Sequence, residues 1–107
     1  MAGITTHVLD TAKGKPAAGI AVTLEVREGD RWTRVADGVT DADGRLRTLT
    51  GSHEVRRGTY RLTFRTGAYS LGFFPEVVIV FSVDDPSEHF HVPLLLSPFG
   101  YSTYRGT

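Results

Sequence analysis

The sequence predicts an all-β sandwich, and three observations lead to this prediction. About eight short segments have the composition of strands, and most of them alternate apolar and polar residues with the two-residue period of a half-buried strand. Glycine, proline and acidic residues that favour turns separate these segments. No segment shows the 3.6-residue period of an amphipathic helix. Short strands separated in this way are typical of two sheets packed face to face.

Length and composition limit the possible classes of protein. A chain of 107 residues has the size of one ordinary domain, so we expect residues 1–107 to fold as a single unit. Such a domain has little core to spare, and association with further copies would stabilise it. Basic and acidic residues number 12 each, which gives no sign of a nucleic-acid partner or an acidic disordered tail. Without cysteine there is no disulfide, thiolate metal ligand or cysteine nucleophile.

Targeting signals are not evident in the sequence. Residues Met1–Asp10 lack the basic and apolar regions of a signal peptide. No apolar run approaches the roughly 20 residues of a membrane helix. The last three residues, Arg-Gly-Thr, do not match the peroxisomal Ser-Lys-Leu signal. We therefore expect a cytoplasmic protein.

The first predicted strand, Ile4–Leu9, fixes the direction of its side chains. Ile4, Thr6 and Val8 share one face, so His7 points away from the core if Ile4 and Val8 point into it. The following Asp10–Gly19 segment is predicted to be a loop. The other predicted strands are Ala21–Arg27, Arg31–Ala36, a short one near Leu46–Leu49, Thr59–Arg65, Val77–Val83, Glu88–Leu95 and Tyr101–Arg105.

Two of these strands have unusual features. Val77–Val83 is apolar on both faces, which predicts a strand covered on both sides. Pro93 cannot donate a backbone hydrogen bond, so its strand should be bulged or locally unpaired at that residue.

The C-terminal stretch His91–Thr107 reads HVPLLLSPFGYSTYRGT and has the pattern of a hairpin. Together with Thr6–Asp10 (THVLD) and Thr40–Arg45 (TDADGR), it resembles the signatures of the transthyretin-like family in its enzymatic branch, the 5-hydroxyisourate hydrolases. The three matches occur in the family's order and span the chain. The family's tail normally ends on Tyr-Arg-Gly-Ser, and Thr107 replaces that serine here.

This resemblance implies a fold, an activity and an assembly. The fold would be two four-stranded sheets with a short helix before the strand that begins at Val77. The link is shorter here than in the family, so the helix should be a single turn or absent. The activity would be the hydrolytic opening of a cyclic amide C–N bond, converting 5-hydroxyisourate to 2-oxo-4-hydroxy-4-carboxy-5-ureidoimidazoline in urate (purine) degradation. No cofactor is implied, and the assembly would be a homotetramer with active sites in a channel between dimers.

The resemblance also assigns site residues. Without it, His7 and His91 would be ordinary surface histidines and Arg45 a solvated arginine after a turn. With it, the two histidines position and deprotonate water, because histidine is the natural base near neutral pH. Arg45 binds substrate and stabilises developing negative charge. The predicted catalytic residues are therefore His7, Arg45 and His91, and the predicted substrate-binding residues are His7, Arg45, Tyr104, Arg105 and Thr107.

Two alternatives accompany this interpretation. The first is a non-catalytic, transthyretin-like small-molecule binding protein. A hormone carrier has apolar groups at the channel positions, so the polar set found here favours an enzyme. The second is a zinc-dependent hydrolase, since His89 and His91 have a spacing that can bind zinc and His7 would complete three nitrogen ligands. We expect no required metal, and we expect His53, in a polar loop, to be solvated.

Overall fold

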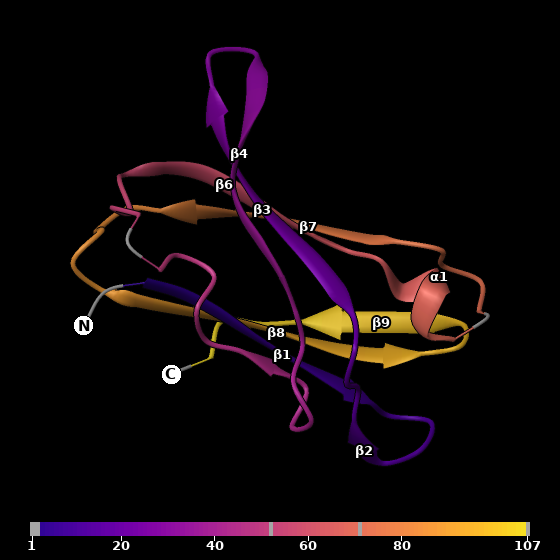
Figure 1. Ribbon diagram of the computed structural model, residues 1–107. Coiled ribbons are helices and arrows are strands. Elements are labelled where there is room, and N and C mark those ends of the chain that lie inside the picture. The colour runs from indigo at the N-terminus through magenta and orange to yellow at the C-terminus, as the bar shows by residue number, and fades with distance from the viewer. Residues whose placement is uncertain (1–2, 52, 71, 107) are drawn as a thin grey trace.

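The computed structural model describes residues 3–51, 53–70 and 72–106, and it is a sandwich of two β-sheets (Figure 1). The predicted all-β class is confirmed. The tip of the β3–β4 hairpin extends beyond the two sheets (Figure 1). In chain order the elements are β1 (Gly3–Asp10), β2 (Lys15–Pro16), β3 (Ala21–Glu28), β4 (Arg31–Val39), β5 (Arg45–Leu46), β6 (Gly58–Phe64), α1 (Thr66–Tyr69), β7 (Val77–Val83), β8 (His89–Ser97) and β9 (Gly100–Thr103).

The two sheets differ in their pairing. One has the order β4-β3-β6-β7 and is antiparallel throughout. The other has the order β2-β1-β8-β9, and β5 also pairs with β1. Within it, β1 and β8 run parallel, from the Gly3–His89 pair to the Asp10–Leu96 pair. The expected four strands per sheet become five in this sheet, because two short strands, β2 and β5, both pair with β1. β2 also gives the predicted Asp10–Gly19 loop a short paired segment.

The core lies between the two sheets and follows the alternation read from the sequence. In β1, Ile4 and Val8 are fully buried and Thr6 is 1% exposed, so Thr5 and His7 lie on the outer face. Fully burying one aliphatic or aromatic side chain stabilises the fold by about 1.5–3 kcal/mol. The opposite sheet and β8 contribute further fully buried side chains, namely Val22, Leu24, Leu62, Phe64 and Leu94.

The prediction that Val77–Val83 is covered on both faces is wrong for this chain. The strand has the predicted bounds, but it lies at the edge of its sheet. Its inward side chains, including Val77 and Val83, are buried, whereas Val78 and Val80 are 42% and 56% exposed. Strand composition alone does not say whether a second layer lies over the outer face.

The predicted interruption at Pro93 is confirmed and falls on one side of β8. Pairing with β1 continues past this residue, and His7 lies opposite Pro93. Pairing with β9 runs from Ser97–Gly100 to Leu94–Thr103 and resumes at one bridge between His91 and Gly106. The ladder is thus broken at the residue that has no N–H group. The Thr103 hydroxyl instead donates to the Pro93 carbonyl over 2.7 Å.

The helix before β7 is a single turn of four residues, as the shortened link predicted. Figure 1 places α1 at the end of the sandwich where β8 turns into β9. Phe73, shortly after the helix, donates its N–H to the carbonyl of Pro98 in that turn. Across the three described ranges, no helix is long and apolar enough to cross a membrane.

Candidate active site

The parallel pairing of β1 with β8 brings the two ends of the chain together on one outer sheet face. Thr5 lies directly opposite His91, and His7 lies opposite Pro93. His89 and His91 share a face because successive side chains alternate along a strand. The predicted histidines His7 and His91 therefore occupy one surface, although 83 positions separate them in the sequence (91 minus 7, less one).

A threonine hydroxyl links the two histidines of β8. Thr5 Oγ1 lies 2.8 Å from His91 Nδ1 and 2.9 Å from His89 Nε2, both hydrogen-bond distances. The contact occupies Nδ1 of His91, so Nε2 is the nitrogen of that ring available to a ligand.

The turn from Asp41 to Arg45 places the predicted arginine beside this surface. Asp41 Oδ1 accepts hydrogen bonds from the N–H groups of Asp43, at 2.8 Å, and Arg45, at 3.0 Å. These bonds, that of Arg45 first, lower the pKa of Asp41. Gly44 adopts a φ of +73°, and a Cβ there would lie 2.4 Å from the Val8 carbonyl oxygen. Only glycine fits this turn, which then leads Arg45 into β5.

His7 is the cross-strand neighbour of Arg45. Its Nε2 lies 2.9 Å from the Asp43 carbonyl oxygen. A carbonyl only accepts, so Nε2 must carry the proton of this bond. In neutral His7 the nitrogen left as an acceptor is therefore Nδ1.

The surroundings of His91 favour its neutral form. Burial lowers the pKa of His91 below its usual value of 6.5, and the positive charge of Arg45 lowers it further, followed by His7 and His89. A histidine that stays neutral at neutral pH is suited to accept a proton.

A hollow of about 590 Å³ lies over this part of the sheet. Its volume falls within the range of roughly 300–1,000 Å³ that is typical of small-molecule sites. Two arginines and two histidines give it a cationic, hydrogen-bonding lining. The lining residues are Gly3, Thr5, Thr6, Arg45, Arg47, Thr48, Thr50, Gly51, His89 and His91.

The C-terminal tail packs against His91. The Gly106 N–H donates to the His91 carbonyl oxygen over 2.8 Å. A Cβ at position 106 would lie 2.7 Å from His91 Cδ2, closer than such contacts allow. Thr5 and Gly106 are not among the site residues predicted from the sequence. Thr5 could have been suspected because it shares the outer face of β1 with His7, but its partner on β8 depends on the pairing register.

Two other predicted tail residues lie elsewhere. Tyr104 and Arg105 line a separate hollow of about 240 Å³ beside β7. The Arg105 guanidinium lies 4.5 Å from the centre of the Phe90 ring and pairs with Glu88 at 3.0 Å. The structure therefore does not bring Tyr104 and Arg105 into one hollow with His91 and Arg45. Thr107 lies outside the described residues, and its predicted contact with substrate stays a prediction.

The zinc alternative requires three ligands in one place. Within the described ranges, no group of three histidine, aspartate or glutamate side chains is arranged to hold a metal ion. Moreover, Nε2 of His7 and Nδ1 of His91 already have hydrogen-bond partners. His53 is exposed, as the sequence predicted.

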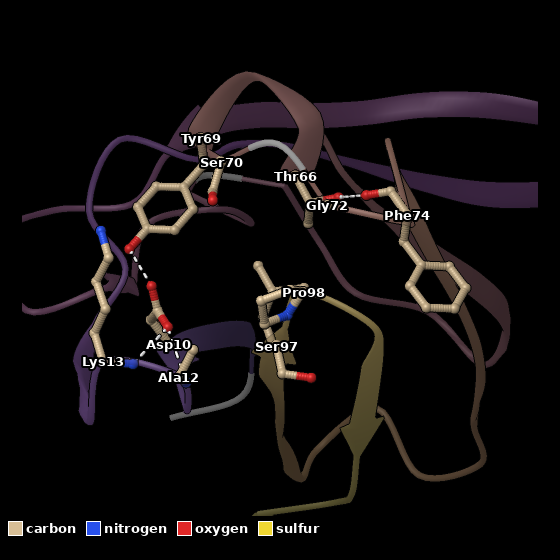
Figure 2. A pocket seen from close by; sticks show the side chains of 11 residues that line it. Asp10, Ala12, Lys13, Thr66, Tyr69, Ser70, Gly72, Phe74, Ser97 and Pro98 are labelled. Atoms are coloured by element: carbon tan, nitrogen blue, oxygen red, sulfur yellow. Dashed lines mark hydrogen bonds between the residues drawn. The ribbon is translucent and has the colours of Figure 1, made fainter.

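A smaller hollow of about 100 Å³ lies where β1 meets α1 (Figure 2). The Asp10 carboxylate accepts hydrogen bonds there from the backbone N–H groups of Ala12 and Lys13, each at 3.0 Å, and from the Tyr69 hydroxyl at 2.7 Å. Its volume is below the range of small-molecule sites. These contacts dock α1 onto the end of β1 and have a structural role.

The fold and site together define a class: a transthyretin-like sandwich that carries histidines and an arginine on the outer face of one sheet. The chain belongs to the HIUase/Transthyretin family, whose model matches residues 4–106.

Relatives of known name fall into both branches of the family. The chain is 48% identical to a 5-hydroxyisourate hydrolase of Deinococcus radiodurans, over 98% of this chain and 96% of the relative. The Klebsiella pneumoniae 5-hydroxyisourate hydrolase structure superposes with a TM-score of 0.82 and 38% identity, covering 97% of this chain and 98% of that one. Sea bream transthyretin in complex with thyroxine superposes with a TM-score of 0.89 and 34% identity, covering 97% and 94%. The fold is therefore common to a 5-hydroxyisourate hydrolase and a thyroxine-bound transthyretin.

Proposed function

We propose that the protein is a 5-hydroxyisourate hydrolase of urate degradation. Its curated relatives with this name match nearly the whole chain at 44–48% identity. Because the fold also occurs in transthyretin, the observation that carries the proposal is local. His91 presents Nε2 beside Arg45 in a hollow of about 590 Å³, with Nδ1 bound to Thr5.

The proposed reaction uses His91 as the base. A water molecule attacks the carbonyl carbon of the cyclic amide, and its proton passes to Nε2 of His91. The C–N bond then breaks, the electron pair stays on the ring nitrogen, and that nitrogen takes up the proton from Nε2 of His91, which regenerates the base. His7, whose Nε2 is bound to the Asp43 carbonyl oxygen, orients the water by accepting a hydrogen bond at Nδ1. One water is consumed, and the product is the ring-opened acid, 2-oxo-4-hydroxy-4-carboxy-5-ureidoimidazoline.

Arg45 supplies the positive charge in this scheme. As water attacks, the carbonyl oxygen of the substrate becomes negative, and a guanidinium held beside it stabilises that charge. The same planar group can bind the oxygen-rich ring before reaction. The Asp41 turn fixes the backbone from which the Arg45 side chain reaches the hollow.

The alternative of a non-catalytic binding protein is supported by the close superposition with a thyroxine-bound transthyretin. Two charged and two ionisable side chains in the hollow favour the hydrolase. Turnover separates the two functions, since a carrier would bind its ligand without consuming it.

We also propose that the protein assembles as a homotetramer. Support comes from the unpaired edge of β7, where Val78 and Val80 are exposed, and from Tyr101 and Tyr104 in the C-terminal segment, which are 43% and 58% exposed. An outer sheet face also makes a better small-molecule site when a second subunit encloses it. A cytoplasmic location stays a prediction, which cell fractionation would test.

The decisive experiment generates 5-hydroxyisourate in place with urate oxidase and follows its decay by absorbance. The protein should accelerate the decay catalytically, at concentrations far below that of the substrate, and should do so after exhaustive chelation. Loss of activity with chelator and recovery with zinc would favour the zinc alternative. No acceleration, with stoichiometric binding of the substrate, would favour the carrier.

A further inference from the structure

The Thr5 hydroxyl joins His89 to His91 and has a single proton to offer. It lies 2.9 Å from Nε2 of His89 and 2.8 Å from Nδ1 of His91. A threonine hydroxyl donates one hydrogen bond and can accept two. At most one of these two ring nitrogens can therefore lack a proton while both bonds are kept.

The direction of the two bonds determines which nitrogen of His91 is basic. If Thr5 donates to His89, it accepts from His91, whose Nδ1 is then protonated and whose Nε2 is a free lone pair. If Thr5 donates to His91, that histidine carries its proton on Nε2 and, while neutral, cannot take a proton there. A protonated His89 excludes the first arrangement, because it can only donate to Thr5.

We propose that His89, acting through Thr5, holds neutral His91 as the tautomer with its proton on Nδ1, so that Nε2 is the base. His89 and Thr5 are in this view positioning residues. The inference rests on the proposed role of His91 as base, and it assigns a role to an exposed histidine that the mechanism itself does not use.

Protonation of His89 should therefore weaken the base through Thr5. It reverses the bond to Thr5, which must then accept from His89 and is drawn to donate to His91. Among the described residues, the other charged or titratable groups that act on the pKa of His91 or line its hollow are His7 on β1, Arg45 on β5 and Arg47. The two bonds of the relay run from Thr5 to His89 and His91 and involve none of these three residues, so the relay can be tested separately from them.

Nitrogen NMR of the ¹⁵N-histidine-labelled full chain tests the proposal directly, because protonated and unprotonated ring nitrogens have very different shifts. At a pH where both residues are neutral, we expect Nδ1–H on His91 and Nδ1–H on His89. A neutral His91 with Nε2–H, or a neutral His89 with Nε2–H, would overturn the proposal. This readout does not depend on turnover, so the proposed function can fail while the relay stands, or the reverse.

Variants then connect the tautomer to activity. Thr5→Val removes the hydroxyl with little change of shape and should lower kcat/KM for 5-hydroxyisourate about three- to tenfold, the scale of one net hydrogen bond. It should also raise the Nε2–H population of His91. Thr5→Ser keeps the hydroxyl and should restore both signals. A Thr5→Val protein with an unchanged His91 tautomer would show that the hydroxyl has only a packing role.

The role of His89 is tested by a double-mutant cycle. His89→Phe keeps a ring but removes the acceptor, and it should lower kcat/KM about two- to fivefold in the native background. In the Thr5→Val background the same change should have no further effect, because the relay is already broken. Additive losses would mean that His89 acts independently of Thr5, which contradicts the relay.

Discussion

His91 is fixed on two sides of its imidazole ring. Thr5 binds Nδ1, and the backbone of Gly106 lies against Cδ2. The ring therefore has little freedom to rotate, and Nε2 is presented to the hollow. A catalytic base gains from such fixed geometry, because the proton transfer requires the acceptor within hydrogen-bond reach of water.

Replacing His91 by alanine should lower turnover about a hundredfold or more, the scale of removing a general base. The fold should remain, because the side chain lies on the outer face and the core residues Val92 and Leu94 are unchanged. Coupled urate-oxidase assays and circular dichroism measure the two effects. His53→Ala, in an exposed loop, is the matched control and should be fully active. An active His91→Ala protein would refute the assignment.

The pH dependence should reflect the lowered pKa of His91. The pH profile of kcat/KM reports ionisations of the free enzyme. The apparent pKa of its acid limb should therefore lie below the ordinary histidine value of 6.5. Arg45→Gln removes one positive charge and should move the pKa of His91 upward, measured by NMR titration. An unchanged pKa in this variant would show that Arg45 does not contribute to the shift.

The same shift has a consequence for stability. A histidine with a lowered pKa binds protons more readily in the unfolded chain than in the folded one. The contribution of His91 to stability is therefore fully present above pH 6.5 and is lost as the pH drops from there toward the folded pKa of His91. The Arg45→Gln variant should lose less stability over this interval.

Sequence and structure contributed differently to the site. His7, Arg45 and His91 came from a family resemblance, and the alternation of β1 placed His7 outside the core. Thr5 and Gly106 could not be derived, because their roles depend on the pairing of β1 with β8 and on the bridge between His91 and Gly106. Those contacts join residues that are distant in the sequence or separated by a turn.

At the scale of elements, the C-terminal tail is an arm that supports β8. It pairs from Gly100 to Thr103, leaves the ladder at Pro93, and returns at Gly106. The sequence predicted the hairpin and the break at Pro93. It did not predict that the tail would divide, with Gly106 at His91 and Arg105 against Phe90.

Gly106→Ala should reduce activity by about tenfold or more while leaving stability nearly unchanged. The new methyl group would lie 2.7 Å from His91 Cδ2, so the ring or the tail must move. A displacement of about 1 Å at a catalytic group can cost a hundredfold in rate. Gly100→Ala is the matched control, because its Cβ would meet Ser97 Oγ at an ordinary 3.7 Å. Equal activity of the two variants would show that the tail does not position His91.

Helix α1 shows how a short element depends on its contacts. A single turn has no stability of its own in water. It is held by the Tyr69–Asp10 hydrogen bond and by a bond from Thr66 to the Phe74 carbonyl (Figure 2). Burial would raise the pKa of Asp10, but the bonds from Tyr69, Lys13 and Ala12 outweigh it, and the pKa is lowered.

Tyr69→Phe should lower the free energy of unfolding by about 1 kcal/mol, the net value of one hydrogen bond. The contribution of Asp10 is present above its unfolded pKa and disappears as the pH falls through the lowered folded value. The variant should therefore lose less stability than the native protein on acidification. Urea unfolding at fixed protein concentration measures both effects, with Tyr101→Phe at an exposed tyrosine as control. Identical stability of Tyr69→Phe and native protein would show that α1 is held by other contacts.

At the scale of the whole molecule, the sequence was sufficient to predict the sandwich. It was not sufficient to predict which outer faces of its sheets are covered. Alternation in β1, β3 and β6 specified which side chains are buried. It failed at β7, where both faces are apolar and only one is covered in the single chain. An apolar edge strand without charged side chains along its outer face is a surface that favours pairing with another chain.

Val80→Lys tests whether this edge joins subunits. Val80 is 56% exposed on the edge strand β7, so a lysine there should cost the single chain little. If β7 meets a second copy, the ammonium group would be buried beside its own symmetry mate, which both desolvation and repulsion disfavour. The native protein should sediment as a tetramer and Val80→Lys as a smaller species.

Val39→Lys is the matched control for this prediction. Val39 is 58% exposed and lies on β4, the opposite edge of the same sheet. The Val39→Lys variant carries the same change of charge at nearly the same exposure. If it stays tetrameric, the dissociation of Val80→Lys is due to the β7 edge.

Because the hollow at His91 is open to solvent in one subunit, the dissociated Val80→Lys protein should also bind substrate more weakly. A native protein that sediments as a monomer with full turnover would remove both the assembly and the enclosed site from the proposal.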